Sequence, residues 1–492
     1  MKSGIQPGST STSSLTPCCI EPVKRNNIPR RKPGGVFARV GVLAVVLFVA
    51  SCQPKTSLHS LNIFFTGDIQ GRLVPCGCFT GQLGGMTRLK TVLNTLATTH
   101  DIRVDIGDAL KGSEDYQVIQ HRYLLRAFAA MGYDALNLGH REARLSVRQL
   151  RSMKQSSPVK LLSANLLDRT TGERIFDAYR IVQRGGRRIA LVGVMDSRGL
   201  GDSLGEGLAV EKMEVALGKL LPELKNRADV IVLLAFTDEA TLASLARDFY
   251  EFAVILGGKV SQPSQKLDKE NRSLIFYITN ESRALGILGI NLSGSSKLTA
   301  GKHEIMLLHE EIPQDESVQK LAEAYRTEIR ATRLAVDDPT RLQENRVPGV
   351  RGAASYVGTD RCEGCHPEAA RKWQQTQHAR AFATLIQRQA EADPNCIPCH
   401  TVGFGSLTGY RREFGNQKLV DVGCESCHGP GSLHVDQRLG QGPISFQFRP
   451  LGAGDCKKCH YGEFSRPFDY EVFWPHIYHG KEPAKAVNMR EK

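Results

Sequence analysis

Four segments in the last third of the chain carry the pattern C-x-x-C-H, in which two cysteines three positions apart are followed at once by a histidine. Two thiols at this spacing can add across the two vinyl groups of one haem, and the next residue can turn its imidazole under the ring as an iron ligand. The four motifs use eight of the chain's thirteen cysteines, so chance does not explain them. The cysteines are Cys362, Cys365, Cys396, Cys399, Cys424, Cys427, Cys456 and Cys459, and the proximal histidines are His366, His400, His428 and His460.

Zinc is the alternative cofactor, because paired C-x-x-C units also form zinc ribbons. Zinc does not explain why a histidine follows every pair. Beyond His309 the chain holds eight histidines, four proximal ones and four others, and four haems with two imidazoles each require eight. The sequence therefore predicts four covalently attached haem c groups, all with two histidine ligands and no position open to a substrate. The candidate second ligands are His378, His434, His476 and His479.

Further residues around these motifs resemble the multihaem cytochromes of the c-552/554 type. The resemblance rests on the run from Tyr356 to His366, on Trp373 before His378, on Gly429-Pro430-Gly431 before His434, and on the closing Trp474 and His479. It implies a small, mainly helical domain over residues 354–492, in which stacked haems replace much of the hydrophobic core.

Residues 1–51 are predicted to be a signal peptide with a lipobox. A basic cluster at Arg30-Arg31-Lys32 precedes an apolar run of about fifteen residues, which is short for a membrane span and suited to a signal-peptide core. Val49-Ala50-Ser51-Cys52 resembles a bacterial lipobox, in which the cysteine, here Cys52, is lipidated. An uncleaved anchor is the alternative. The protein is expected to be exported and anchored to a membrane, in the periplasm or at the cell surface.

The formal net charge of +13 does not indicate a nucleic-acid partner. Residues 1–51 hold seven Lys or Arg residues against the single Glu21, so nearly half of the excess lies in a segment that is expected to be removed. The propionates of four haems would cancel the rest.

Residues 58–310 are predicted to form a separate α/β domain. Apolar, β-rich runs alternate with helical patterns, and several of the strands end in Gly-Asp or Gly-Gly. Polar side chains are thereby placed at strand tips, where open α/β sheets bind ligands. The strands are expected at Leu61–Phe65, Ile102–Ile106, Ile189–Val194, Val230–Phe236 and Ala253–Leu256, and the helices at Met86–Leu96, Arg122–Met131 and Leu208–Leu221.

The order of these strand tips resembles the metallophosphoesterase domain of bacterial 5′-nucleotidases and thiosulfohydrolases, which implies an α/β/β/α sandwich. The match uses segments 66–71, 105–108, 137–142, 233–237 and 256–261. Asp68 and Asp108 stand where the family has metal ligands.

Other positions depart from the family's pattern. Its histidines are replaced by Gln70, Arg141, Phe236, Lys259 and Ser261, and its asparagine by His140. A two-metal hydrolase needs a full set of ligands to hold both ions and activate water, so we expect no phosphate-ester hydrolysis. A single, weakly held divalent ion on Asp68, Gln70, Asp108 and His140 remains open, as does an anion pocket formed by Lys259 and Arg141.

A C-x-C pair, Cys76 and Cys78, follows the first strand tip. These cysteines lie beside the former metal site, and three interpretations stay open: a redox-active disulfide, a pair of soft metal ligands, or an inert loop staple.

Residues 311–353 are predicted to be a charged helical linker followed by a hinge that begins at Val347. The chain as a whole is expected to be an electron-transfer lipoprotein whose partners are cytochromes or membrane electron-transfer proteins. Two enzymatic alternatives remain: an oxidoreductase acting on a sulfur or nitrogen oxyanion through Cys76 and Cys78, and a metal-dependent phosphoesterase.

Overall fold

The computed structural model describes residues 60–75, 82–279, 281–292, 298–347, 352–441, 446–461 and 468–481. The predicted signal peptide, the lipidation site Cys52 and the pair Cys76 and Cys78 lie outside these ranges. Within the described ranges, no helix is long and apolar enough to cross a membrane.

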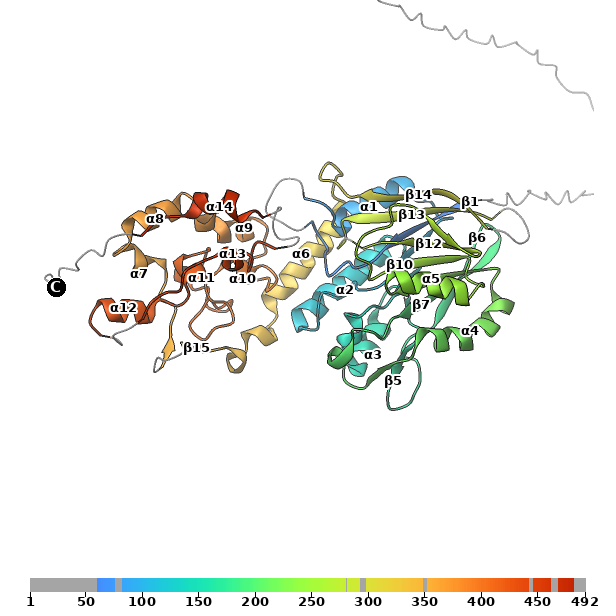
Figure 1. The fold of residues 1–492 in the computed structure, drawn as a ribbon, viewed down its shortest axis with the longest axis horizontal. Coiled ribbons are helices and arrows are strands. Elements are labelled where there is room, and N and C mark those ends of the chain that lie inside the picture. Colours follow the sequence, from blue (N-terminus) through green and yellow to red (C-terminus); the bar gives the residue numbers. More distant parts are fainter. Residues whose placement is uncertain are drawn as a thin grey trace, which may run out of the picture. The chain divides into compact units, whose positions relative to one another are not determined.

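Two six-stranded mixed sheets form the centre of the N-terminal region (Figure 1). The strand order is β14-β13-β1-β2-β3-β4 in the first sheet and β11-β12-β10-β9-β7-β6 in the second, with parallel strands in the middle of each. The first sheet consists of β1 (Ser60–Thr66), β2 (Ile102–Asp105), β3 (Ala135–Asn137), β4 (Leu161–Leu162), β13 (Ala284–Asn291) and β14 (Thr299–Leu307). The second consists of β6 (Tyr179–Arg184), β7 (Arg187–Met195), β9 (Val230–Phe236), β10 (Val254–Gly258), β11 (Asp268–Glu270) and β12 (Ser273–Tyr277).

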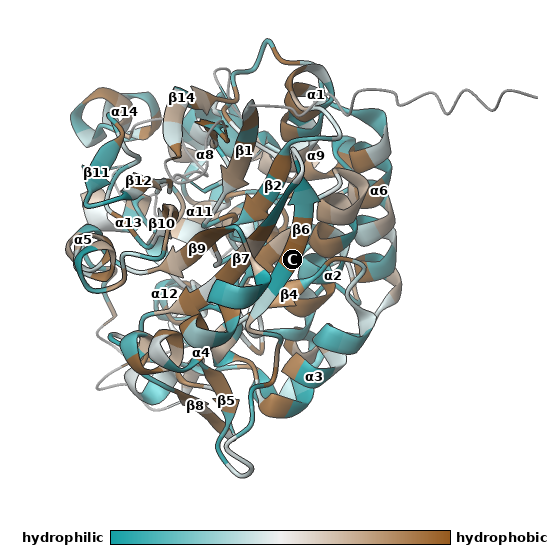
Figure 2. Cartoon of the chain, turned by 90° about the vertical axis from the view of Figure 1, so that its right-hand side faces the viewer, coloured by the Kyte–Doolittle hydropathy of each residue, from teal (hydrophilic) through white to brown (hydrophobic). Residues whose placement is uncertain are grey.

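Alternating side chains along the strands build three apolar layers. In β1, Ile63 and Phe65 belong to the core between the two sheets, whereas Phe64 faces a core shared with helices. This alternation follows from the period of two in an extended strand. Figure 2 shows the resulting apolar colouring along the central strands.

Helices cover both outer faces, which confirms the predicted α/β/β/α sandwich. The first outer core lies between the first sheet and the helices α1 (Met86–Leu96), α2 (Asp115–Ala130), α3 (Val147–Ser156) and α6 (Glu316–Ala331). The second outer core lies between the second sheet and the helices α4 (Met213–Arg227) and α5 (Glu239–Asp248). A small ribbon joins β5 (Leu166–Asp168) to β8 (Leu208–Val210).

The predicted start of the helix Leu208–Leu221 was wrong, because the helix begins five residues later, at Met213. Leu208 starts β8 and packs in the first outer core, whereas α4 begins at Met213 and packs in the second. Local periodicity does not reveal that two adjacent segments are buried in different cores.

The helix predicted at the start of the linker is confirmed as α6, and it shares the first outer core. Val318, Ala322, Tyr325 and Ile329 recur on one helical face and are buried. Most of the predicted hinge, residues 348–351, lies outside the described ranges.

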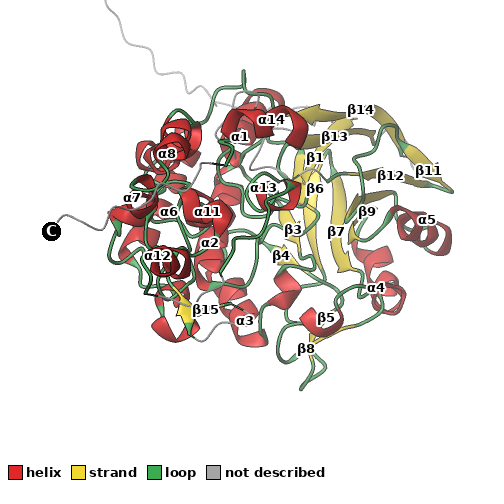
Figure 3. Ribbon diagram, turned by 60° about the vertical axis from the view of Figure 1, so that its left-hand side comes forward, coloured by secondary structure: helices red, strands yellow, loops and turns green. Residues whose placement is uncertain are grey.

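The C-terminal region is mainly helical, as predicted, with short helices joined by loops (Figure 3). Among the described residues of this region, the buried apolar cluster has seven members, which include Ile397, Tyr410 and Leu419. The helices are α7 (Thr359–Glu363), α8 (Pro367–Gln374), α9 (Ala381–Gln387), α10 (Ile397–His400), α11 (Cys424–His428), α12 (Ser432–Arg438), α13 (Ala453–Cys456) and α14 (Tyr470–Ile477), and β15 (Asn345–Arg346) pairs with β16 (Ala353–Ala354) at the start of the region.

Candidate haem sites and the former metal site

The C-x-x-C-H motifs fold as single helical turns. The His366 amide donates to the Cys362 carbonyl at 2.9 Å, and the His460 amide donates to the Cys456 carbonyl at the same distance. A helical turn brings residues four apart onto one face. Each of these two motifs thereby places its first thiol and its imidazole on the same side of the backbone.

Three of the predicted proximal histidines lie opposite three of the predicted second ligands. The ring centres are 6.1 Å apart for His366 and His434, 6.0 Å for His460 and His378, and 5.9 Å for His428 and His479. Metal–imidazole bonds of about 2 Å would hold two such rings on opposite sides of one metal with centres about 6 Å apart. These residues therefore fit haem iron with two axial imidazoles.

His400 is oriented by a backbone contact. Its Nδ1 lies 2.6 Å from the Ala381 carbonyl oxygen, and because a carbonyl only accepts, Nδ1 carries the proton and Nε2 is left as the ligating atom. His476, the fourth candidate second ligand, is an exposed residue of α14. The ligand opposite His400 stays a prediction.

Burial favours the uncharged form of these imidazoles. It lowers the pKa of each ring below the ordinary value, with nearby positive charge acting in the same direction on all but His460. Neutral imidazole is the form that binds a metal. The rings concerned are His378, His428, His434 and His460.

The four motifs are also arranged as two pairs. The side chains of Cys362 and Cys424 lie next to each other, and so do those of Cys399 and Cys459. The first motif therefore lies beside the third and the second beside the fourth, which the spacing of the motifs along the sequence did not reveal.

The residues that match the metal-site positions of the phosphoesterases are Asp68, Gln70, Asp108 and His140, and we call this cluster the former metal site. Asp68 and Gln70 follow β1, and Asp108 follows β2. Asp68, Gln70 and Asp108 all adopt positive φ angles, of 56°, 50° and 58°. Asp68 accepts from Gln70 Nε2 at 2.8 Å and from Thr279 Oγ1 at 3.1 Å. Burial raises the pKa of Asp68, and burial together with the Glu142 charge raises that of Asp108 well above the ordinary range.

Cationic side chains occupy this site. Arg141 Nε lies 3.5 Å from Asp108 Oδ2, and Lys259 Nζ lies 3.4 Å from Asp196 Oδ2. His140, the fourth predicted ligand of a single ion, contacts the Asp196 carbonyl oxygen through Nε2 at 2.7 Å.

No group of three or more His, Cys, Asp or Glu residues in the described ranges is arranged to hold a metal ion. The side chains present do not fit a two-metal centre, and a single ion at this site stays a prediction.

Two further carboxylates belong to this site: Glu142, which ends the matched segment 137–142, and Asp196, which sequence reasoning missed. Glu142 is buried, and it accepts from the amides of Leu110 at 2.7 Å and Gly139 at 2.8 Å. Asp196 follows β7 directly, as Asp68 follows β1 closely, so the same strand-tip argument could have found it.

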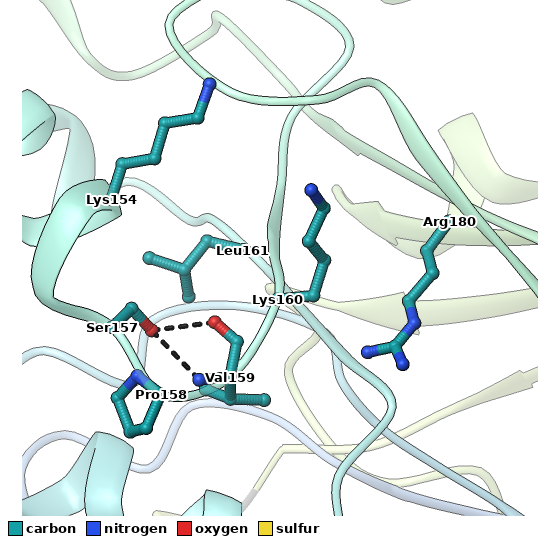
Figure 4. A pocket seen from close by; sticks show the side chains of 7 residues that line it. All are labelled: Lys154, Ser157, Pro158, Val159, Lys160, Leu161 and Arg180. Carbon is teal, nitrogen blue, oxygen red and sulfur yellow. Dashed lines mark hydrogen bonds between the residues drawn. The ribbon is translucent and has the colours of Figure 1, made fainter.

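A pocket elsewhere contains none of the predicted site residues (Figure 4). It is lined by Lys154, Lys160 and Arg180, but these cations are already engaged. Lys154 and Lys160 pair with Asp177, and Arg180 donates to the Asp134 carbonyl at 2.6 Å. Its cations therefore give little support for an anion site.

Known proteins match the two regions separately. A family model described as cytochrome c554 and c-prime matches residues 361–429. Cytochrome c-554 of Nitrosomonas europaea is 38% identical over 93 residues, which are 16% of this chain and 40% of that protein. The 5′-nucleotidase of Vibrio cholerae is 25% identical over 225 residues, which are 42% of this chain and 40% of that protein.

A solved structure shows a likeness to the N-terminal region. The 5′-nucleotidase precursor from Thermus thermophilus is 20% identical, with a TM-score of 0.48, and the match covers 55% of this chain and 59% of that one. The chain spans about two fifths of the length of the two curated relatives named above.

The chain is thus a multidomain protein whose C-terminal region resembles c-type cytochromes. More particularly, it joins a phosphoesterase-like α/β region, similar to 5′-nucleotidases, to a region similar to cytochrome c554, as the sequence predicted. The second similarity supports covalently bound haem c and a role in electron transfer.

Proposed function

We propose that the protein is an exported, lipid-anchored electron carrier that holds four haem c groups, each between two histidines. When bound, haem c supplies reversible one-electron chemistry. The chain's part is to attach each group through two thiols, to fill both axial positions with imidazole and so to exclude a substrate from the iron.

The observation that supports this proposal most strongly is the facing of three imidazole pairs with centres 5.9–6.1 Å apart. A single pair at this distance is unremarkable in a folded protein. Three pairs, each joining a motif histidine to a predicted second ligand, are what axial ligation requires. The pairing of the motifs by neighbouring cysteine side chains would bring the first haem close to the third and the second close to the fourth.

We infer that the phosphoesterase-like region does not hydrolyse phosphate esters. Arg141 and Lys259 bring two positive charges to carboxylates of the former metal site, and a cation already paired there opposes binding of a divalent ion. The region would instead dock a redox partner. The oxyanion-oxidoreductase alternative rests on Cys76 and Cys78, which lie outside the described residues.

A paired assay on the purified, haem-loaded protein tests this proposal. We expect rapid electron exchange with a soluble monohaem cytochrome c in stopped flow. We also expect no cleavage of bis-p-nitrophenyl phosphate with Mg²⁺, Mn²⁺ or Zn²⁺ added. Metal-dependent cleavage that Asp108→Ala abolishes would establish the hydrolase instead. Haem oxidation or reduction by sulfite or nitrite that is lost in Cys76→Ser would favour the oxidoreductase.

A further inference from the structure

Glu425 is a buried residue of the third haem motif, directly after Cys424. Its side chain oxygens accept from three backbone amides, those of Val357 at 3.0 Å, Gly358 at 2.8 Å and Gly431 at 2.7 Å, and the residue is 4% exposed. Hydrogen bonds to a carboxylate are stronger than those between neutral groups. One side chain therefore holds two other segments of the chain, one before the first motif and one after the third.

The first of these segments leads into the first haem motif. Gly358 is the N-cap residue of α7, and its carbonyl oxygen accepts from the Arg361 amide at 3.2 Å. The helix contains Cys362, whose carbonyl oxygen accepts from the His366 amide. The place where α7 begins thus determines where the imidazole of His366 lies.

The second segment leads into α12, which carries His434. Gly431 is the N-cap residue of this helix, and its carbonyl oxygen accepts from the Val435 amide at 3.0 Å, so His434 lies in the first turn. The two segments also contact each other directly. The Ser355 amide donates to Ser432 Oγ at 2.8 Å, and the Ser432 amide donates to the Ser355 carbonyl oxygen at 3.1 Å.

We propose that Glu425 is a positioning residue that holds His366 and His434, the predicted axial ligands of the first haem, opposite each other. Their ring centres are 6.1 Å apart, and this separation depends on where α7 and α12 begin. Hydrogen bonds from outside a ligand set commonly fix the orientation of metal-binding side chains. The inference rests on the proposed function, because it requires haem at the first motif. A residue of the third motif would thereby control the ligation of a different haem.

Electron paramagnetic resonance of the full-length holoprotein, together with a pyridine haemochrome count, tests this inference. Glu425→Ala should keep four haems and convert about a quarter of them to a high-spin form, because one imidazole no longer reaches the iron. Glu425→Gln should have the same effect to a smaller extent, since the amide keeps one accepting oxygen but turns an NH₂ group toward backbone donors.

Glu363→Ala is the matched control. Glu363 holds the same position in the first motif as Glu425 does in the third, and it accepts from the exposed Gln374 side chain at 3.3 Å rather than from backbone amides. Its replacement should leave both the haem count and the spin state unchanged.

Double variants identify the haem concerned. Glu425→Ala combined with His434→Ala should still show about a quarter of high-spin haem, because both changes act on the same iron. Glu425→Ala combined with His479→Ala should show about a half, because His479 is the predicted ligand opposite His428 of the third motif and the two changes then act on different irons.

Four low-spin haems in Glu425→Ala would overturn the inference and leave the proposed function standing. A count of three haems in this variant would also overturn it, since Glu425 would then serve haem attachment, and so would a high-spin fraction of about a half in the combination with His434→Ala. Should Glu425→Ala not fold, Glu425→Gln decides by the same criteria. A wild type without haem at the first motif would instead contradict the proposed function.

Discussion

Arg412 and Asp337 form a buried ion pair between the haem-binding region and the segment that follows α6. Nη2 and Nε of Arg412 donate to the two carboxylate oxygens of Asp337 at 2.9 Å each, and the side chains are 6% and 2% exposed. The same guanidinium donates to the carbonyl oxygens of Ile329 and Thr332 at the end of α6 and to that of Ala392. One side chain therefore joins the α6 carboxyl end to the loop that precedes the second haem motif.

Arg412→Ala should destabilise the holoprotein by about 3–5 kcal/mol, because it leaves the Asp337 carboxylate buried and unpaired. Arg412→Lys should also be destabilising, since an ammonium cannot reproduce the two parallel hydrogen bonds of a guanidinium. Equilibrium denaturation in guanidinium chloride measures both. Arg333→Ala is the control, because the Arg333 side chain is 75% exposed and lies 4.0 Å from Glu413, so it should cost less than about 1 kcal/mol. Equal effects of Arg412→Ala and Arg333→Ala would contradict this account of the junction.

His434→Ala should leave the haem content unchanged and convert about a quarter of the haem to a high-spin form, because thiols attach each group while the second imidazole sets its spin state. Pyridine haemochrome analysis and electron paramagnetic resonance measure the two quantities. His303→Ala replaces an exposed histidine of β14 and should change neither. An entirely low-spin His434→Ala protein would show that His434 is not the ligand opposite His366.

His121 should make the protein less stable in mild acid. Burial lowers the pKa of this imidazole from 6.5 to about 4, so between these values the unfolded chain binds a proton that the folded chain does not. Stability therefore falls as pH falls through this window, by on the order of 3 kcal/mol at most. His121→Leu should flatten the dependence in denaturation curves recorded from pH 7 to pH 4. The exposed His100→Gln should leave it unchanged, and an unaltered slope in His121→Leu would refute the assignment.

Divalent metal should not stabilise the phosphoesterase-like region. A ligand that binds only the folded state raises the melting temperature with its concentration, and we expect no such rise with Mn²⁺ or Zn²⁺ at millimolar concentration. Asp108→Asn should be tolerated, because burial and the Glu142 charge raise the pKa of Asp108 and so disfavour a negative charge at this position. An uncharged amide of the same size avoids that cost. A metal-dependent rise that Asp108→Asn removes would instead indicate a working metal site.

The sequence was most informative where chemistry or periodicity is local. The helix Met86–Leu96 and the strand Val230–Phe236 were predicted with the bounds that the structure shows, because each buries a regular apolar pattern. The haem motifs were evident because two thiols and an imidazole act within five residues.

Contacts between distant positions could not be predicted. Nothing near Arg412 in the sequence indicates Asp337. The pairing of His366 with His434, rather than with another of the four candidates, likewise depends on how the short helices fold together. The sequence of α6 predicts a helix with one apolar face, but it does not indicate which core that face packs into.

The haem content and spin state of the purified protein test the central claim most directly. We predict four haems per chain by pyridine haemochrome analysis, with low-spin absorption spectra in both the oxidised and the reduced state. A chain without covalent haem would contradict the account, and so would fewer than four haems in fully matured protein.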